Sequence, residues 1–247
     1  MRQNKLTGKL PTKYQILIKI KWIIVLLLLS AVIYGSYTLN QYVSGNQVKG
    51  EEKTEVILDA GHGGDDPGKV GVNEVLEKDV NLQITMKVKE CLEKEGVTVK
   101  LTREMDEGLE TEGAKNKKVE DMKARVRMIN EIKPELVVSI HQNSYQTEDV
   151  KGAQVFYYIH SQKGEEMAKI LQEAVRTVDP ENHRQVKANE SYYLLKRTEV
   201  PTVIVECGFL SNPQEAERLS DADYQDRIAW CLSQGILKYR AEQEKSE

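Results

Sequence analysis

The first fifty residues of the chain contain no aspartate or glutamate, although the chain has 39 acidic residues in all. Basic residues do occur there: Arg2, Lys5, Lys9, Lys13, Lys19, Lys21 and Lys49. The rest of the chain therefore holds all 39 acidic residues and 28 of the 35 basic ones, so its net charge is −11. An acidic domain repels the phosphates of nucleic acids, and we expect no nucleic-acid partner.

Cysteine is scarce as well, with only Cys91, Cys207 and Cys231 in the sequence. An odd number of cysteines without a CxxC pair argues against a disulfide framework and against a cysteine-rich metal cluster. Cys91 and Cys231 lie on apolar faces of expected helices, and Cys207 continues an apolar strand. The sequence therefore predicts buried free thiols.

Charge is also absent from residues 22–39, which read WIIVLLLLSAVIYGSYTL. A membrane-spanning helix needs about 20 apolar residues. The positive-inside rule would place the basic tail in the cytoplasm and the rest of the chain outside. A cleaved signal peptide is the alternative, but no Ala-x-Ala site follows the run. We therefore expect an uncleaved anchor, and both alternatives export the remainder of the chain.

The pattern of residues divides the chain into five expected parts: a basic cytoplasmic tail (1–21), a transmembrane anchor (22–39), a polar linker (40–53), one folded domain (54–241) and a polar tail (242–247). Strands are expected at 55–59, 97–101, 135–141, 153–159, 192–195 and 202–207. Helices are expected at 77–95, 119–132, 164–178, 213–219 and 223–241. This alternation predicts an α/β fold, a single domain with a mostly parallel twisted sheet and helices on both faces.

Two histidines directly follow apolar strands, His62 in LDAGHGG and His141 in VVSIHQN. Sites in parallel sheets lie beyond the carboxyl ends of the strands. The loop around His62 lacks the Walker lysine and a complete GxGxxG motif, because Asp66 replaces the third glycine, and this argues against a phosphate-binding loop. Two histidines and one carboxylate form the usual hydrolytic zinc site. His160 and His183 lie in polar contexts and are not expected to bind metal.

Two glutamates could supply the carboxylate chemistry of such a site. Glu77 begins the first long helix of the domain, where an acidic residue also suits the helix dipole. Glu206 lies in the apolar strand PTVIVECGF, where a buried carboxylate is costly unless it is paired or faces a cation. An ion pair with a neighbour such as Arg125 would give Glu206 a structural role, whereas a position facing a metal would make it a general base or acid.

Five motifs make the chain similar to the zinc-dependent N-acetylmuramoyl-L-alanine amidases of bacterial cell walls (the amidase_3 type). They are ILDAGHGGDDPG, EKDVNL, KARVRMIN, VVSIHQNS and VPTVIVECGFLSNPQEAERL, and they occur in this order over nearly all of residues 54–240. The resemblance implies a set of zinc ligands, a catalytic carboxylate and two substrate-binding or supporting residues. The implied zinc ligands are His62, Glu77 and His141. The implied catalytic carboxylate is Glu206, and the implied substrate-binding or supporting residues are Asn143 and Arg125.

Within this family the chain resembles the short, N-terminally anchored members associated with the spore cortex. They cut stem peptides from peptidoglycan so that muramic lactam can form, by hydrolysing the amide between the lactyl group of N-acetylmuramic acid and L-alanine. The resemblance implies action outside the cytoplasmic membrane, in the cell wall or the spore intermembrane space, with an accessory lipoprotein as a candidate partner. Residues 143–152 are too few for the inhibitory helix of larger members, so we expect an open site.

Two other functions are compatible with the same motifs. A zinc peptidase that cuts within the stem peptide would use the same metal chemistry. A non-catalytic peptidoglycan-binding or regulatory module would keep the fold but should lack a zinc ligand or the catalytic acid. The three positions of the zinc ligands and the position of the catalytic acid all carry the expected residues here, which favours an enzyme.

Overall fold

The computed structural model describes residues 12–45, 54–111 and 113–245. The chain divides into two compact units, residues 1–52 and 53–247. The parts of the expected tail and linker at 1–11 and 46–53 lie outside the described residues.

In the first unit, helix α1 (Thr12–Gly45) includes the whole apolar run that the sequence predicts to be a membrane anchor. The helix also takes in the end of the expected basic tail and the beginning of the expected linker. Among the described residues, no helix is long and apolar enough to cross a membrane. The transmembrane anchor thus has no support from the structure and stays a prediction of the sequence.

The second unit alternates strands with helices. Its strands are β1 (Val56–Ala60), β2 (Val99–Leu101), β3 (Leu136–Asn143), β4 (Gln154–Tyr158), β5 (Lys187–Asn189) and β6 (Thr202–Phe209). Its helices are α2 (Glu77–Lys94), α3 (Lys117–Ile132), α4 (Gln162–Arg176), α5 (Tyr193–Arg197), α6 (Pro213–Ser220) and α7 (Ala222–Glu244). The domain expected at 54–241 contains all of these elements except the end of α7.

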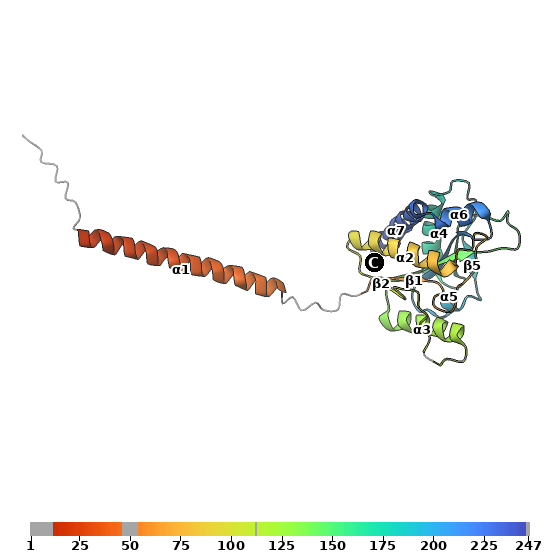
Figure 1. Cartoon of the computed structure of the whole chain (residues 1–247), viewed down its shortest axis with the longest axis horizontal. Helices are drawn as coiled ribbons and strands as arrows, with labels where there is room; N and C mark the ends of the chain where they lie inside the picture. Colours follow the sequence, from red (N-terminus) through yellow and green to blue (C-terminus); the bar gives the residue numbers. More distant parts are fainter. Residues whose placement is uncertain (1–11, 46–53, 112, 246–247) are drawn as a thin grey trace, which may run out of the picture. The chain divides into compact units, whose positions relative to one another are not determined.

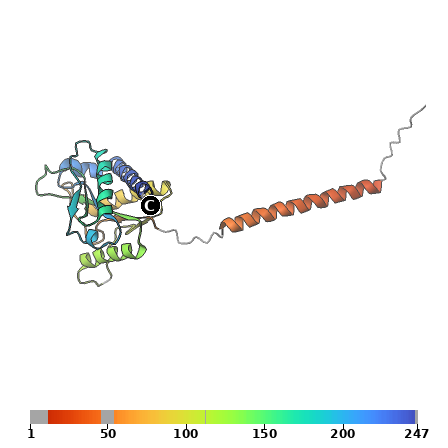
Figure 2. The ribbon, with the colours of Figure 1, turned by 180° about the vertical axis from the view of Figure 1, so that it is seen from behind.

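The strands form one sheet in the order β2-β1-β3-β6-β4-β5. Strands β2, β1, β3 and β6 run parallel, β4 runs antiparallel to β6, and β5 runs parallel to β4. Helices α2, α4 and α7 pack on one face of the sheet and α3 and α5 on the other (Figure 1). The view from behind shows the same layers (Figure 2). The predicted α/β fold with a mostly parallel, doubly covered sheet is confirmed.

Strand β1 shows why helices must pack on both faces of the sheet. Val56 and Leu58 belong to the large core with α2, α4 and α7, whereas Ile57 joins a smaller core with Ile129 of α3. Successive side chains of a strand point to opposite faces. A strand with apolar residues in succession must therefore be buried on both sides. Asp59 follows the same alternation and falls on the α3 face.

The prediction of a strand at 192–195 is wrong, because residue 192 caps the short helix α5 and residues 193–195 belong to it. The side chain of Asn189 accepts a hydrogen bond from the backbone amide of Tyr192 at 2.7 Å and so closes a turn. Leu194 and Leu195 then become buried from a helix instead of a strand. The strand in this region is β5, which the sequence analysis missed. Because β5 lies at the edge of the sheet and is mostly exposed, its sequence carries no apolar pattern.

Capping side chains help to set where helices begin, and α3, α4 and α7 are examples. The side chains of Asn116, Ser161 and Asp221 each accept a hydrogen bond from a backbone amide in the first turn of α3, α4 and α7. Such N-caps satisfy amides that have no partner within the helix. These helices consequently begin one or two residues before the expected positions.

The cysteines agree with the prediction of free thiols. Cys207 and Cys231 are buried, and Cys91 is half-buried. Burial raises the pKa of the Cys207 thiol far above its ordinary value, and the charge of Glu206 adds to the effect. Cys207 is therefore protonated and behaves as a small apolar side chain in the core.

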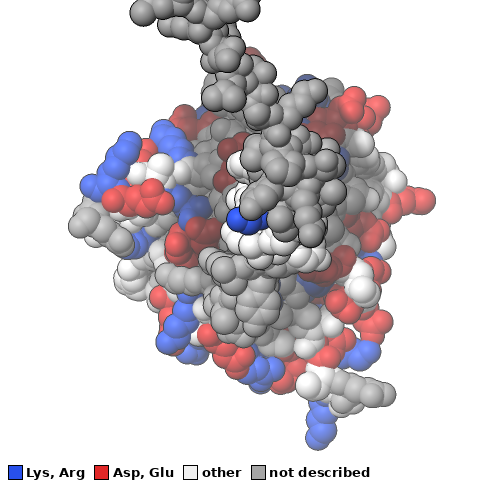
Figure 3. All heavy atoms as spheres, turned by 90° about the vertical axis from the view of Figure 1, so that its left-hand side faces the viewer, with Lys and Arg blue, Asp and Glu red and all other residues white. Residues whose placement is uncertain are grey.

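Acidic and basic side chains are interspersed on the face of the domain seen in Figure 3. Several ion pairs of the domain join exposed residues of one helix, such as Lys94 with Glu90 and Lys169 with Glu165. Exposed pairs are screened by water and add little to stability. The stability of the domain therefore comes mainly from its buried apolar clusters.

Replacing Ile129 by alanine tests the smaller core. Ile129 is fully buried between α3 and the sheet, and such truncations lower the free energy of unfolding by about 2–5 kcal/mol. Val119→Ala on the same helix is the control, because Val119 is 45% exposed and its truncation should change stability by less than about 0.5 kcal/mol. Chemical denaturation followed by circular dichroism measures both. Equal losses would contradict the described packing of α3.

Candidate metal centre

Neighbouring parallel strands bring His62 and His141 together. Strands β1 and β3 pair in register as far as Ala60 and Ile140, so their carboxyl ends meet at one edge of the sheet. The backbone amide of Gly61 continues this ladder by donating to the Ile140 carbonyl at 3.1 Å. His141 is the next residue of β3, and His62 follows Gly61. The two side chains therefore lie at the same edge, with ring centroids 5.0 Å apart.

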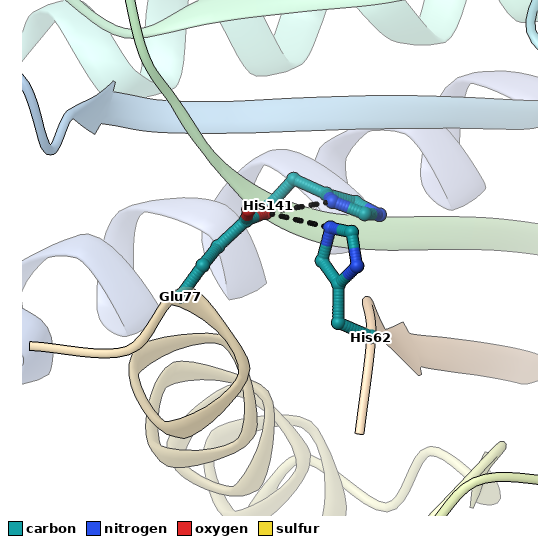
Figure 4. Close-up of side chains that lie close together, drawn as sticks. All are labelled: His62, Glu77 and His141. Atoms are coloured by element: carbon teal, nitrogen blue, oxygen red, sulfur yellow. Dashed lines mark hydrogen bonds and ion pairs between the residues drawn. The ribbon is translucent and has the colours of Figure 1, made fainter. Parts of the chain in front are cut away.

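Glu77, the first residue of α2, contacts both imidazoles (Figure 4). Its Oε1 lies 3.2 Å from Nε2 of His62 and 2.9 Å from Nδ1 of His141. One ligand atom from each of the three residues lies within 4.8 Å of the others. The structure thus brings together all three residues that the sequence suggested as metal ligands.

Two glycines allow the backbone to approach the three side chains. A Cβ atom at Gly61 would lie 2.2 Å from the His141 ring, and one at Gly68 would lie 2.5 Å from the Glu77 carboxylate. Gly68 also has a φ of +70°, which favours glycine. His62 itself has a φ of 61°, and a residue other than glycine in this region costs about 1–3 kcal/mol. Surrounding contacts must hold His62 in place.

The charge of Glu77 is stabilised in a buried position. Burial alone would raise the pKa of its carboxyl, but hydrogen bonds and charges from His141 and His62 outweigh this effect and hold the pKa well below its ordinary value. The backbone amides of Lys69 and Gln142 also donate to the carboxylate, at 2.8 and 3.2 Å. Glu77 is therefore ionised, the form that binds a cation.

Glu206 lies on β6, directly opposite His141 on β3. It is 9% exposed, and its Oε2 has no hydrogen-bond partner among the described residues. Burial raises the pKa of Glu206 to about 7; the charges of His141 and His62 oppose the rise, and Glu77 adds to it. A carboxyl group with such a pKa can both accept and return a proton near neutral pH.

Arg125 lies behind the histidines, almost fully buried. Its guanidinium pairs with Asp59 at 2.6 Å and donates to the backbone carbonyl of His62 at 2.7 Å. No ion pair joins Arg125 to Glu206 among the described residues, so the structural role suggested for Glu206 is wrong. Arg125 instead supports the loop that carries His62.

A second buried arginine, Arg103, supports the same loop and was missed by the sequence analysis. It donates to the carbonyls of Ala60 at 2.9 Å, Gly61 at 3.1 Å and Lys78 at 2.8 Å. Together with Arg125, it binds the carbonyls of three successive residues, 60–62. Its only signal in the sequence is a position just after β2, which does not distinguish it from an exposed arginine.

Asp66 is another functional residue that the sequence analysis did not assign to the site. Its Oδ2 lies 2.8 Å from Nδ1 of His62, the ring nitrogen not in contact with Glu77. Metal-binding histidines commonly hydrogen-bond a carboxylate through the second ring nitrogen, which fixes the tautomer and the orientation of the ring. Lys118 pairs with the other oxygen of Asp66 at 2.7 Å.

The three candidate ligands line a cavity of about 430 Å³, together with Glu206 and Asn143. Asn143 is half-buried, and its Oδ1 accepts a hydrogen bond from the next backbone amide at 2.8 Å. Residues 144–153 contain no helix, as expected for a site without an inhibitory helix. His160 and His183 do not belong to the group of possible ligands found among the described residues.

Comparison with known families agrees with this geometry. The family model described as N-acetylmuramoyl-L-alanine amidase (Amidase_3) matches residues 56–238. The germination-specific N-acetylmuramoyl-L-alanine amidase of Bacillus subtilis is 40% identical over 190 residues, which cover 76% of this chain and 80% of that protein. The probable cell wall amidase LytH of Staphylococcus epidermidis is 27% identical, and the match covers 62% of its length.

Solved structures of similar sequence share the fold. The CwlD amidase from Clostridioides difficile, in complex with the GerS lipoprotein, is 42% identical with a TM-score of 0.74. The match covers 76% of this chain and 98% of that one. The amidase AmiC2 of Nostoc punctiforme is 32% identical with a TM-score of 0.67, over 76% of this chain and 98% of that one.

Replacing Asp66 by alanine tests its support of His62. Loss of a partner that orients a metal-binding histidine weakens metal affinity about 10–100-fold, so zinc should bind more weakly while the protein stays folded. Asp65→Ala is a matched control, because Asp65 is the neighbouring aspartate, is 74% exposed and pairs with the exposed Lys117. Competition with a chelator measures the affinities. Unchanged zinc binding in the Asp66 variant would contradict this role.

Proposed function

The chain belongs to the N-acetylmuramoyl-L-alanine amidase family, and on this premise we propose that His62, Glu77 and His141 hold a zinc ion and that Glu206 is the catalytic carboxylate. As an amidase of this family, the protein hydrolyses the amide between the lactyl group of N-acetylmuramic acid and L-alanine of the peptidoglycan stem peptide. The proposal rests on one observation: two imidazoles and the ionised carboxylate of Glu77 converge beside the buried Glu206.

The residues fit a zinc ion in three respects. Two histidines and one carboxylate are a common ligand set of catalytic zinc, which keeps a fourth position open. Asp66 hydrogen-bonds the second ring nitrogen of His62, as partners of metal-bound histidines do. Oε2 of Glu206 has no hydrogen-bond partner among the described residues, so a polar or charged species in the cavity would satisfy it.

The protein's own groups can carry the proton transfers of the reaction. When bound, zinc supplies Lewis-acid chemistry, because it polarises a carbonyl group and makes a water molecule more acidic. Glu206 accepts the proton of the attacking water as the new C–O bond forms. It then returns this proton to the nitrogen of L-alanine as the C–N bond breaks. The pKa of Glu206, raised to about 7 by burial, suits both steps.

The supporting residues fix the geometry of these steps. Arg125 and Arg103 hold the carbonyls of the loop that carries His62, and Asp66 orients its ring. Catalytic groups lose efficiency when they are displaced by about 1 Å. These buried contacts therefore contribute to the reaction by limiting the movement of His62, without touching substrate.

The biological setting follows from the relatives and belongs to the same proposal. The germination-specific relative supports a role in the spore cortex, where removal of stem peptides allows muramic lactam to form. The lipoprotein in complex with the C. difficile amidase supports an accessory lipoprotein as a partner of this chain. Peptidoglycan lies outside the cytoplasmic membrane, and the apolar run at 22–39 would keep the enzyme at the membrane surface.

Replacing Glu206 by glutamine tests its catalytic role. General acid–base catalysis contributes about 10²–10⁴-fold, so amidase activity should fall at least 10²-fold, while zinc content stays that of the native protein. The control is Glu217→Gln, an exposed glutamate of α6, which should keep full activity. Full activity in the Glu206 variant would refute the assignment of the catalytic carboxylate.

The products of digestion distinguish an amidase from a stem-peptide peptidase. Peptidoglycan treated with the zinc-loaded protein should release intact stem peptides that begin with L-alanine, because the cleaved bond precedes this residue. Mass spectrometry of the soluble fragments identifies them. Fragments cut within the stem would instead favour the zinc peptidase, and removal of zinc with a chelator should abolish the release.

A further inference from the structure

Tyr192 lies beside the catalytic carboxylate although it follows no motif of the sequence. It is the residue before helix α5, and Asn189 holds its backbone amide. Its ring packs against Phe156, with 5.5 Å between ring centroids. Phe156 of β4 pairs with Ile204 of β6. The ring of Tyr192 is thereby held on a rigid part of the sheet by a long-range contact.

This position is close to Glu206. Ile204 and Glu206 are two residues apart on β6, so their side chains point to the same face of the sheet. Tyr192, Ile204 and Glu206 all line the cavity that contains the three candidate ligands. Burial raises the pKa of Tyr192, and the negative charge of Glu206 adds to this rise. The phenol is therefore within electrostatic reach of Glu206 and carries its proton at neutral pH.

The hydroxyl of Tyr192 has no use within the fold. No described residue exchanges a hydrogen bond with it, and the residue is 37% exposed. Tyr192 lines the cavity, is held by its ring and its backbone amide, and has a hydroxyl without a partner among the described residues, so this hydroxyl is available to donate to a ligand.

We propose that Tyr192 is a further catalytic residue, whose hydroxyl donates a hydrogen bond to the carbonyl oxygen of the scissile amide. This inference rests on the proposed function. Negative charge develops on that oxygen when water adds to the carbonyl carbon, and a fixed donor stabilises it. Tyr192 keeps its proton throughout. The water proton passes through Glu206 to the leaving nitrogen, so the balance of the hydrolysis is unchanged.

Tyr192→Phe removes the hydroxyl and keeps the ring on Phe156. Loss of one such donor lowers kcat about 10²–10³-fold where it acts alone. Because zinc would share in stabilising the charge on the carbonyl oxygen, we expect kcat to fall by at least about tenfold. KM should change less than about twofold, because the bond strengthens only in the transition state. Zinc content and melting temperature should match the native protein. A kcat within twofold of the native value would overturn the proposal.

Two further variants distinguish the role of the Tyr192 hydroxyl from that of its ring. Tyr192→Leu removes both and should be at least as impaired as Tyr192→Phe; impairment of the leucine variant alone would show that only the ring matters and would overturn the proposal. The matched control is Tyr158→Phe. Tyr158 is half-buried on β4, and its ring packs against His160 at 5.3 Å. This control should keep native kcat, and an equal loss there would also overturn the proposal.

A binding measurement makes the test independent of turnover. In the Glu206→Gln background, Tyr192→Phe should change the dissociation constant of an intact muropeptide less than about threefold, because the substrate carbonyl carries little charge. A larger loss of binding would assign Tyr192 to substrate affinity instead of catalysis. Failure of the proposed function would be visible separately, because the native protein would then release no peptide that begins with L-alanine.

Discussion

The ionised carboxylate of Glu77, buried between two imidazoles, is the interaction on which the rest of the centre depends. A buried charge is costly unless it is paired and hydrogen-bonded, and Glu77 is only 2% exposed. Its partners come from the loop after β1, from the end of β3 and from backbone amides near both. Three segments distant in the sequence are therefore fixed relative to one another, and the cavity forms where they meet.

The loop that carries His62 has to be held in a conformation that it would not adopt alone. His62 has a positive φ, and the carbonyls of residues 60–62 point to the buried guanidinium groups of Arg103 and Arg125. The charge of Arg125 is in turn balanced by Asp59, whose pKa is lowered to about 2 despite burial. This arrangement places fixed positive charge behind the loop and leaves its imidazole to face Glu77.

Two carboxylates of different character then share one cavity. Glu77 is ionised because the histidines lower its pKa, whereas burial raises the pKa of Glu206. Environments that move the pKa values of two similar groups apart are how one site provides both a ligand and an acid–base catalyst. Asp66 and the two arginines hold His62 and its loop, and Tyr192 lines the same cavity as Glu206.

The sequence by itself determined the alternation of strands and helices, the positions of His62 just beyond β1 and of His141 near the end of β3, and the unusual carboxylate at Glu206, because apolar periodicity and polar interruptions are local signals. Only the tertiary structure decided which polar groups meet. It paired Arg125 with Asp59 instead of Glu206, and it joined Asp66 to His62. It also made residues 193–197 a helix and β5 an exposed edge strand. Partners in a buried network are far apart in the chain, and an edge strand needs no apolar face, so neither leaves a local pattern to read.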